Sequence, residues 1–600
     1  MQFDPRASMR RLARGLAAAG LLSAGGLLPA GVGAGDPTHP AFDPLLDAGG
    51  RACGPVFNAP PALLQALVRV KAGAMPAPVA DMAPRLYPDL GRLSLRIETR
   101  SPQAQAWFNQ GLRLAYGFNH AEAQRAFQAA QKLDPQCAMC FWGEALILGP
   151  NINVPMMPEA HAPAWAALQK AVALKAQAGD RNRALIEALE TRYSSDPKAD
   201  RSAHDARYAD AMKAVAARFP ADDNLLTLAA EAAMDTQPWD YWEAAGAKPK
   251  GRGAYIVETL ETVLARSPNH AGAIHLYLHA MEASTQPEKA LPAARRLAAL
   301  TPGAGHLVHM PAHIYYRLGM YRESLVANQR AVRVDEGYFK TSPSDPIYKA
   351  AYYPHNLHFV MVSALMGGEA ATALDAAARL DAAMPADVVR AFAIMQPIKG
   401  APYAAHAVFS DAKTVLALPA PPEDLVVVRA MYHYARAVAQ AAAKDFAGAE
   451  ADIAALARLD ASADFKAFEP WGVPAQAIVQ TAQRVAQGRL ADARGDLDGA
   501  AKAYASAIAT EDTLSYTEPP YWYYPVRQSL ASVRLRQGRL DDARDALRDS
   551  LVRVRNNGWA LAALAEVERR RGDAGAERTA RAALARAWFG AKAGPDLSRI

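Results

Sequence analysis

The chain has 600 residues, of which 51% are hydrophobic and 21% are charged, and its formal net charge is +6. This length exceeds what one compact core can enclose, so it predicts several domains or one extended array of repeated units. The nearly balanced charge argues against nucleic acid as the main partner, because removing residues 1–34, which carry four Arg and one Asp, leaves 62 basic and 59 acidic groups.

The first 34 residues have the pattern of a secretory signal. A basic start is followed by an apolar run and by small residues that end at Ala34, where cleavage is expected. The pair Arg10-Arg11 leaves twin-arginine export open beside the general secretory route. No later segment has the roughly 18 apolar residues that span a bilayer. We therefore expect a periplasmic or secreted protein whose mature chain has no transmembrane segment.

Residues 35–100 are rich in proline and glycine and predict an N-terminal arm or cap. A helix hairpin is expected from residue 101. Small residues at Gly111 and Ala123 let two antiparallel helices approach closely, and Phe127 fills the groove between them. Pro135 ends the second helix. Similar alanine-rich patterns continue along the chain without strand-like alternation, so the predicted fold class is all-α.

Three cysteines are present, at Cys53, Cys137 and Cys140. The last two have the CxxC spacing, but Phe141 follows where covalent haem attachment requires histidine. In an oxidising compartment this spacing favours a local disulfide between Cys137 and Cys140. A redox-active pair or a soft-metal site stays open as an alternative. Cys53 has no evident partner.

Insertions divide the helical pattern. Turn-rich segments are expected at 150–163, 236–253 and about 336–353, and an aromatic segment lies at 516–525. We expect one set of repeats over 101–385, a more irregular set over 386–592 and a loose tail at 593–600. The tryptophans of these insertions either close over a groove or anchor the loops, and anchoring is favoured; they are Trp239, Trp242 and Trp522.

The central region repeats with a period of 34 residues. His309 follows His275 by 34 positions, and His313 follows His279 by the same step. A period of this length, with paired helices and a proline near the end of each unit, resembles the tetratricopeptide repeat. The predicted architecture is therefore a tetratricopeptide-like α-solenoid, a right-handed superhelix of helix hairpins with irregular loop insertions.

A more specific resemblance rests on several short segments. They are GFNHAEAQRAF, CAMCFWGEALILGPNIN, PWDYW, HLYLHAMEAS, PGAGHLVHMPAHIYYRLGMY, YYPHNLHF and EPPYWYYP. Together they are similar to a bacterial family of exported tetratricopeptide-repeat proteins without an established biochemical activity. The similarity covers residues 100–590. It implies the solenoid fold, and it assigns no catalytic residues.

The histidines of the central repeats form a candidate metal site. In tetratricopeptide repeats the first helix of each pair lines the concave surface, and stacking places equivalent residues side by side. Repeats that start at Ala271, Gly305 and Pro354 would turn a column of imidazoles toward one groove. The candidate ligands are His275, His279, Glu282, His306, His309, His313, His355 and His358.

Histidines four residues apart share a helix face, and imidazoles from helices about 8–10 Å apart can meet at one ion. Mixed histidine and carboxylate ligands suit zinc, iron, manganese or copper. Glu231 and Asp235 are candidates for additional oxygen ligands, and Tyr316 and Arg317 for contacts to a bound molecule. A neutral pocket for an anionic or polar ligand and plain repeat packing are the alternatives.

The sequence thus predicts an exported solenoid that binds one or two transition-metal ions in a concave groove. An ion with three histidine ligands and an open position can activate water or dioxygen, which makes enzymatic activity a hypothesis. The alternative is a non-enzymatic scaffold that holds a peptide or partner protein in the groove. Insertions that fill the groove would argue against the scaffold.

Overall fold

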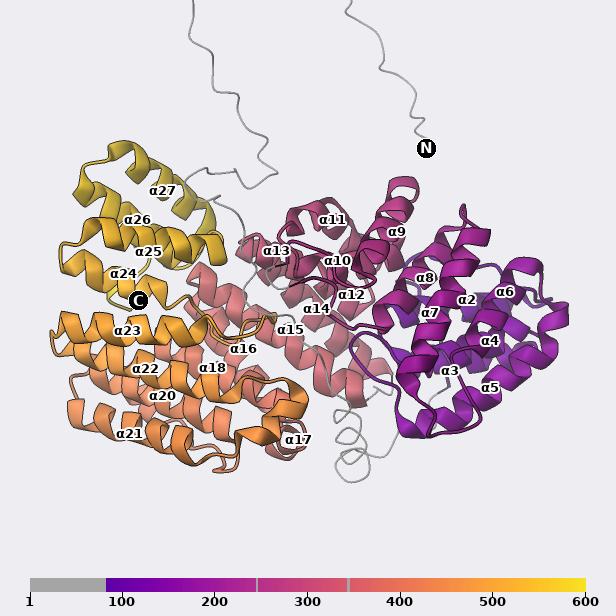
Figure 1. Ribbon diagram of the computed structural model, residues 1–600, viewed down its shortest axis with the longest axis horizontal. Coiled ribbons are helices and arrows are strands. Elements are labelled where there is room, and N and C mark those ends of the chain that lie inside the picture. Colours follow the sequence, from indigo (N-terminus) through magenta and orange to yellow (C-terminus); the bar gives the residue numbers. More distant parts are fainter. Residues whose placement is uncertain (1–82, 244–245, 343–345, 600) are drawn as a thin grey trace, which may run out of the picture. The chain divides into compact units, whose positions relative to one another are not determined.

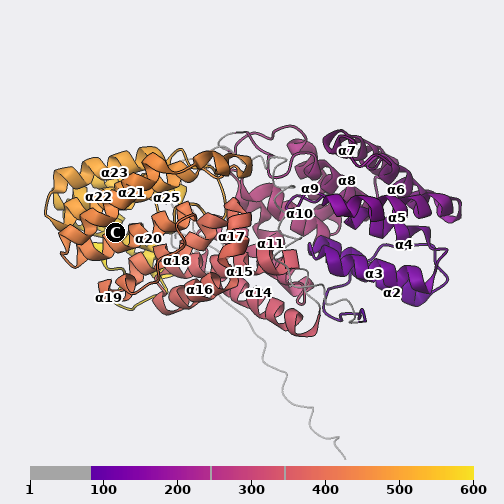
Figure 2. The ribbon, with the colours of Figure 1, turned by 90° about the horizontal axis from the view of Figure 1, so that it is seen from below.

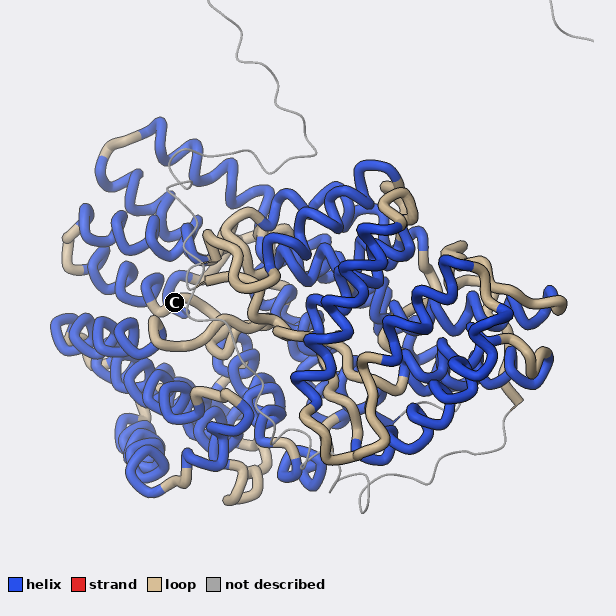
Figure 3. Tube along the Cα trace, turned by 45° about the vertical axis from the view of Figure 1, so that its right-hand side comes forward, coloured by secondary structure: helices blue, strands red, loops and turns tan. Residues whose placement is uncertain are grey.

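The protein is described by a computed structural model over residues 83–243, 246–342 and 346–599. Within these ranges it contains 26 α-helices, a few short 3-10 segments and no β-strand (Figure 3). Successive helices pack as hairpins, which confirms the predicted all-α solenoid with loop insertions. The predicted signal at 1–34, most of the arm and Cys53 lie outside the described residues.

The first hairpin consists of α2 (Pro102–Tyr116) and α3 (His120–Leu133), at the indigo end of the ribbon in Figure 1. The hydroxyl of Ser101 caps α2 by accepting a hydrogen bond from a backbone N–H of its first turn. A Cβ atom at Gly111 would lie 2.7 Å from the ring of Phe127. Only glycine permits this approach of the two helices, as the sequence pattern predicts.

Eight further helices follow up to residue 300, and neighbours in the chain pack on each other. They are α4 (Ala138–Ile147), α5 (His161–Leu174), α6 (Asp180–Glu190), α7 (Arg201–Arg218), α8 (Asp223–Asp235), α9 (Gly253–Arg266), α10 (Ala271–Glu282) and α11 (Leu291–Leu300). Cys137 and Cys140 are joined by a disulfide with a Cα–Cα distance of 5.4 Å at the start of α4.

The remaining helices continue the array, and α22 packs on both α20 and α23 (Figure 2). They are α12 (Gly305–His309), α13 (Pro311–Arg317), α14 (Tyr321–Thr341), α15 (Pro346–Gly367), α16 (Ala370–Ala383), α17 (Ala386–Ala391), α18 (Gln396–Phe409), α19 (Ala412–Leu416), α20 (Val426–Ala442), α21 (Phe446–Ser462), α22 (Ala475–Ala493), α23 (Leu497–Glu511), α24 (Arg527–Arg536), α25 (Leu540–Arg553), α26 (Gly558–Arg571) and α27 (Ala574–Ala587). None of the helices in the described part of the chain combines the length and apolar character needed to cross a membrane.

The insertion at 236–253 is confirmed, since α8 ends at Asp235 and α9 begins at Gly253. The insertion predicted at about 336–353 is wrong, because α14 continues to Thr341 and α15 starts at Pro346. The buried Tyr348 supports the helical path by donating a hydrogen bond to the carboxylate of Asp335 at 3.0 Å. Pro354, where a repeat was expected to start, therefore lies inside α15.

The described part of the arm has no helix and lies along the first and central repeats. Leu95 and Ile97 are buried in the core. The guanidinium of Arg113 donates to the carbonyl of Leu93 at 2.7 Å. This segment therefore covers α2 as the predicted cap.

The described residues of the tail, 593–599, are held against the C-terminal repeats. Arg599 donates to the carbonyl of Val408 at 2.6 Å, and Arg489 donates to the carbonyl of Arg599 at 2.8 Å. The expectation of a loose tail is wrong for these residues, because their backbone and side chains supply hydrogen bonds to α18 and α22.

Hydrogen bonds also join helices that are far apart in the sequence. The hydroxyl of Tyr321 donates to the carbonyl of Arg555 at 2.9 Å, across 234 residues. The indole of Trp559 donates to the carbonyl of Leu365 at 3.1 Å, across 194 residues. The repeats after residue 525 thus contact α14 and α15 directly, and not only their neighbours in the chain.

Candidate metal centre

Helix α10 carries the first two candidate ligands. His275 and His279 are one turn apart and share a face. Every residue of α10 is buried, because α2, α8, α9, α11 and α13 all pack around it. His275 has no exposed surface and His279 is 2% exposed. This helix therefore presents two imidazoles to the interior of the protein.

The next four ligands come from α12, α13 and α15. His306 and His309 lie on α12, and His313 lies on α13. The break between these two short helices falls at Met310, just before Pro311, whose ring cannot continue the hydrogen-bond ladder. His355 lies on α15 beside them, with its ring centroid 4.8 Å from that of His309.

Three histidines form the first triad: His275, His279 and His306. One ligand nitrogen from each lies within 4.8 Å of the others. The Nε2 atoms of His275 and His306 are 3.1 Å apart. Their Nδ1 atoms and both nitrogens of His279 are buried without a hydrogen-bond partner among the described residues. Such groups are costly to bury unless something binds them.

The first triad is uncharged. Burial, and then the neighbouring His313, lower the pKa of His275 to about 3. Burial and the neighbouring imidazoles also hold the pKa values of His279 and His306 well below the usual range. A neutral imidazole keeps a lone pair on one nitrogen, which is the form that binds metal ions.

The second triad consists of His309, His313 and His355, again with ligand nitrogens within 4.8 Å of one another. Nε2 of His313 lies 2.9 Å from Nε2 of His309 and 3.4 Å from Nε2 of His355. Nδ1 of His309 lies 2.6 Å from Oδ1 of Asn328, whose amide nitrogen donates to a carbonyl. That oxygen must accept, so His309 is protonated at Nδ1 and directs its lone pair into the triad.

A pair of carboxylates orients His313 from the other side. Its Nδ1 lies 2.9 Å from Glu282 and 3.2 Å from Glu518. Burial opposes protonation, but the two carboxylates outweigh it and raise the pKa of His313 to about 10. Carboxylates behind a histidine ligand are typical outer partners of a metal ion. Glu282, His313 and Glu518 also satisfy the spacing of a ligand group by themselves.

Glu518 was not predicted from the sequence. It lies on the aromatic insertion between α23 and α24, which the sequence marks only by its composition. Its Oε1 accepts a hydrogen bond from the hydroxyl of Tyr516 at 2.6 Å and lies 3.7 Å from Nε of Arg317. The sequence offered one signal for Glu518, which is an acidic residue within an aromatic insertion of a histidine-rich solenoid.

The other predicted residues have different neighbours. His358 belongs to none of the ligand groups of the described residues and packs its ring 5.6 Å from that of Tyr523. Its predicted role as a ligand is corrected, because its ring packs against the aromatic insertion. Tyr316 packs edge to face on Phe359, with ring centroids 5.8 Å apart. Arg317 donates to the backbone carbonyl of Glu282 at 2.8 Å and so anchors the end of α10.

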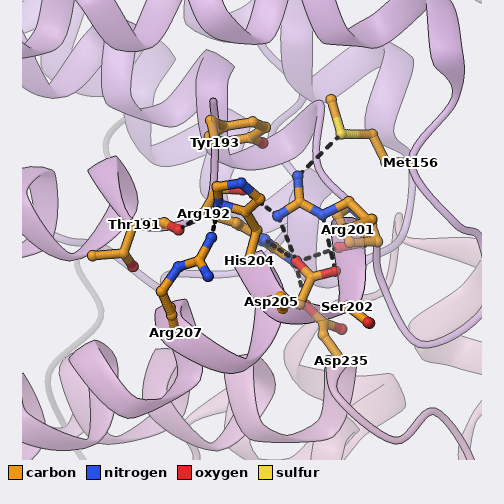
Figure 4. A network of polar contacts seen from close by, with 12 residues as sticks. Met156, Thr191, Arg192, Tyr193, Arg201, Ser202, His204, Asp205, Arg207 and Asp235 are labelled. Carbon is orange, nitrogen blue, oxygen red and sulfur yellow. Dashed lines mark hydrogen bonds and ion pairs between the residues drawn. The ribbon is translucent and has the colours of Figure 1, made fainter. Parts of the chain in front are cut away.

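Glu231 and Asp235 are not brought to the histidine triads. Asp235 accepts a hydrogen bond from Arg192 at 2.8 Å, and Arg192 also pairs with Asp205 at 3.1 Å (Figure 4). Glu231 lines a small cavity with Asp235 and His120. Their predicted role as additional ligands is corrected, because the inward face of α8 meets the cation of Arg192.

Most of the histidines predicted to line a concave groove are buried in the interior of the protein. Phe118 packs on His275 with ring centroids 4.6 Å apart, and Trp239 packs on His279 at 4.8 Å. Trp242 donates to the carbonyl of Ala280 at 2.6 Å and anchors its insertion. Phe118 and the insertion at 236–253 thus cover the first triad.

The burial of His120 predicts a measurable pH dependence of the stability of the protein. Burial, and then the charge of Arg192, lower its pKa to about 4. Since an unfolded histidine has a pKa of about 6.5, the unfolded chain binds a proton that the folded chain does not between pH 6.5 and pH 4. Stability therefore falls with acid by about 1.4 kcal/mol per pH unit from this residue. His120→Gln should reduce the pH slope of the unfolding free energy by that amount, measured by urea denaturation; an unchanged slope contradicts the assignment.

No known protein family and no curated protein matches the chain. Among solved structures it is similar to a chain of the APC/C hetero-tetramer Cut9–Hcn1, at 12% identity and a TM-score of 0.28 over 84% of this chain and 77% of that one. It is also similar to the human IFIT1 dimer with m7Gppp-AAAA, at 13% identity and a TM-score of 0.32 over 79% of this chain and 94% of that one. Yeast Tom70 is similar at 11% identity and a TM-score of 0.24 over 81% of this chain and 89% of that one. At these TM-scores the helix arrangements differ, so the repeat architecture rests on the hairpins of this chain itself.

Proposed function

We propose that this chain binds two transition-metal ions, one at each histidine triad. The observation that carries the proposal is the convergence of six imidazoles from three successive repeats, with buried nitrogens that lack other partners in the first triad. Imidazole ligands suit zinc, copper and iron, and the nearby carboxylates extend this set to manganese. Repeat packing alone requires no such convergence.

Three protein ligands leave a coordination position for water or another molecule. This arrangement is typical of zinc sites that activate water and contrasts with the closed four-ligand sites that only support a fold. We therefore propose a metal-dependent activity over a purely structural ion. The signal-like N-terminus supports a periplasmic or secreted location.

The test is a metal titration of untagged protein stripped with a chelator. We expect about two equivalents of Zn²⁺ per chain by elemental analysis after dialysis, because each triad brings three imidazoles together and uptake at the second triad displaces the proton of His313. His275→Ala combined with His279→Ala should leave one equivalent. His406→Ala is the matched control, since this half-buried histidine lies outside both triads and hydrogen bonds to Ser410. Protein that stays metal-free in micromolar Zn²⁺ overturns the proposal.

A second candidate function, binding of a partner polypeptide, is supported by the C-terminal repeats. A cavity of about 840 Å³ lies between α18, α20, α22, α24, α26 and the tail. A photoreactive residue at Ala442, which lines this cavity, should then cross-link a polypeptide in cells. The same residue at the exposed Lys502 of α23 is the control, and equal cross-linking at both positions contradicts this candidate.

A further inference from the structure

A cavity of about 130 Å³ lies under the aromatic insertion. Its walls come from α13, from the insertion and from the end of α25, and they are largely aromatic. The rings that line it belong to Tyr316, Tyr321, Tyr516, Tyr521, Trp522 and Tyr523. A cavity of about 150 Å³ is known to hold benzene, so a volume of about 130 Å³ is of the size that takes a single aromatic ring.

This cavity adjoins the metal centre. Glu518 lines the cavity and also belongs to the ligand group with Glu282 and His313. Tyr316 and Arg317 line it from α13, the helix that carries His313. A polar group of a bound molecule that reaches Glu518 therefore lies beside the second triad.

Oγ of Ser515 and Nε1 of Trp522, both in the cavity wall, are buried without a hydrogen-bond partner in the described part of the chain. Trp522 is only 5% exposed. A buried donor without a partner destabilises the protein, and an oxygen on a bound molecule relieves that cost. Mostly apolar walls with a few convergent polar groups are the usual composition of a small-molecule site.

We propose that this cavity binds a single-ring phenolic compound, with its ring against the tyrosine and tryptophan side chains and its hydroxyl at Glu518. Aromatic walls favour a ring over an aliphatic chain, because edge-to-face contacts between rings stabilise the complex beyond the burial of apolar surface. The carboxylate of Glu518 accepts from a hydroxyl and repels an anion. Placement of this hydroxyl next to a bound ion rests on the proposed metal function, whereas binding in the cavity does not.

Calorimetric titration with phenol and with toluene tests the proposal on the full chain, both stripped and loaded with Zn²⁺. We expect one phenol per chain and at least 10-fold weaker binding of toluene, which lacks the hydroxyl. Ser515→Phe fills the cavity and should abolish phenol binding. Ser506→Phe makes the same change at an exposed position of α23 and should leave binding unchanged.

The outcomes separate this proposal from the metal proposal. A chain that takes up two Zn²⁺ but binds no phenol overturns the cavity assignment alone. Phenol binding without any uptake of Zn²⁺ supports the cavity and overturns the metal function. Equal affinity for phenol and toluene in the wild-type chain overturns the role of the hydroxyl, and this comparison needs no variant to fold. Phenol binding that survives in folded Ser515→Phe also overturns the proposal.

Discussion

Replacing His313 by alanine is expected to remove one of two bound metal ions and to leave the other in place. His313 is the residue that joins the second triad to the two carboxylates. Loss of an outer partner already costs a metal site about 10–100-fold in affinity, so loss of this ligand should weaken the second site by at least about 100-fold. Competition with a chromophoric chelator measures both sites in one titration.

A graded variant separates ligation from general damage. Asn328→Leu removes the acceptor for Nδ1 of His309 and keeps all six imidazoles. It should weaken the second site by about 10–100-fold without changing the first. Circular dichroism of each variant establishes that the helices are intact. Retention of both ions at unchanged affinity in His313→Ala would show that the second triad is not a metal site.

Arg192→Met is expected to lower the free energy of unfolding by about 3–5 kcal/mol near pH 7. Arg192 is 2% exposed and bridges the carboxylates of Asp205 and Asp235. Methionine keeps much of the volume but leaves buried carboxylates without this cation. Removing one partner of a buried ion pair is strongly destabilising, because the other charge stays buried without compensation. Urea denaturation followed by circular dichroism gives the loss directly.

Two comparisons show whether charge is the cause. Arg218→Met removes the exposed pair with Asp180, whose side chains are 53% and 63% exposed, and should cost less than about 1 kcal/mol. Adding Asp235→Leu to Arg192→Met should recover part of the loss, because one unpaired carboxylate is removed. A double variant that is less stable than Arg192→Met contradicts this explanation.

The fold was predictable because its determinants are local. Gly111 and Phe127 sit at fixed positions within one hairpin, and the 34-residue step of the histidines repeats the stacking of neighbouring hairpins. These patterns predict that His275, His279, His309 and His313 converge, which the structure shows. The path of residues 336–353 was not predictable in this way, since Tyr348 is held by packing and by Asp335.

The metal centre was predictable only in part. Its histidines share one helical period, but Glu518 reaches His313 from a loop 205 residues away, and no periodic pattern encodes such a contact. The burial of the centre was not predictable for the same reason, because Phe118 and Trp239 reach it from segments outside the central repeats. The role of Glu231 depended on a register that the insertion after α8 interrupts.

The hydrogen bonds from Tyr321 to Arg555 and from Trp559 to Leu365 have a consequence for how this array comes apart. A solenoid whose units touch only their neighbours frays from its ends, one unit after another. Here the last hairpins cannot detach without also exposing α14 and α15, and α15 carries His355 of the second triad. The terminal repeats are therefore expected to resist hydrogen exchange as strongly as the middle ones, and to hold the metal centre closed.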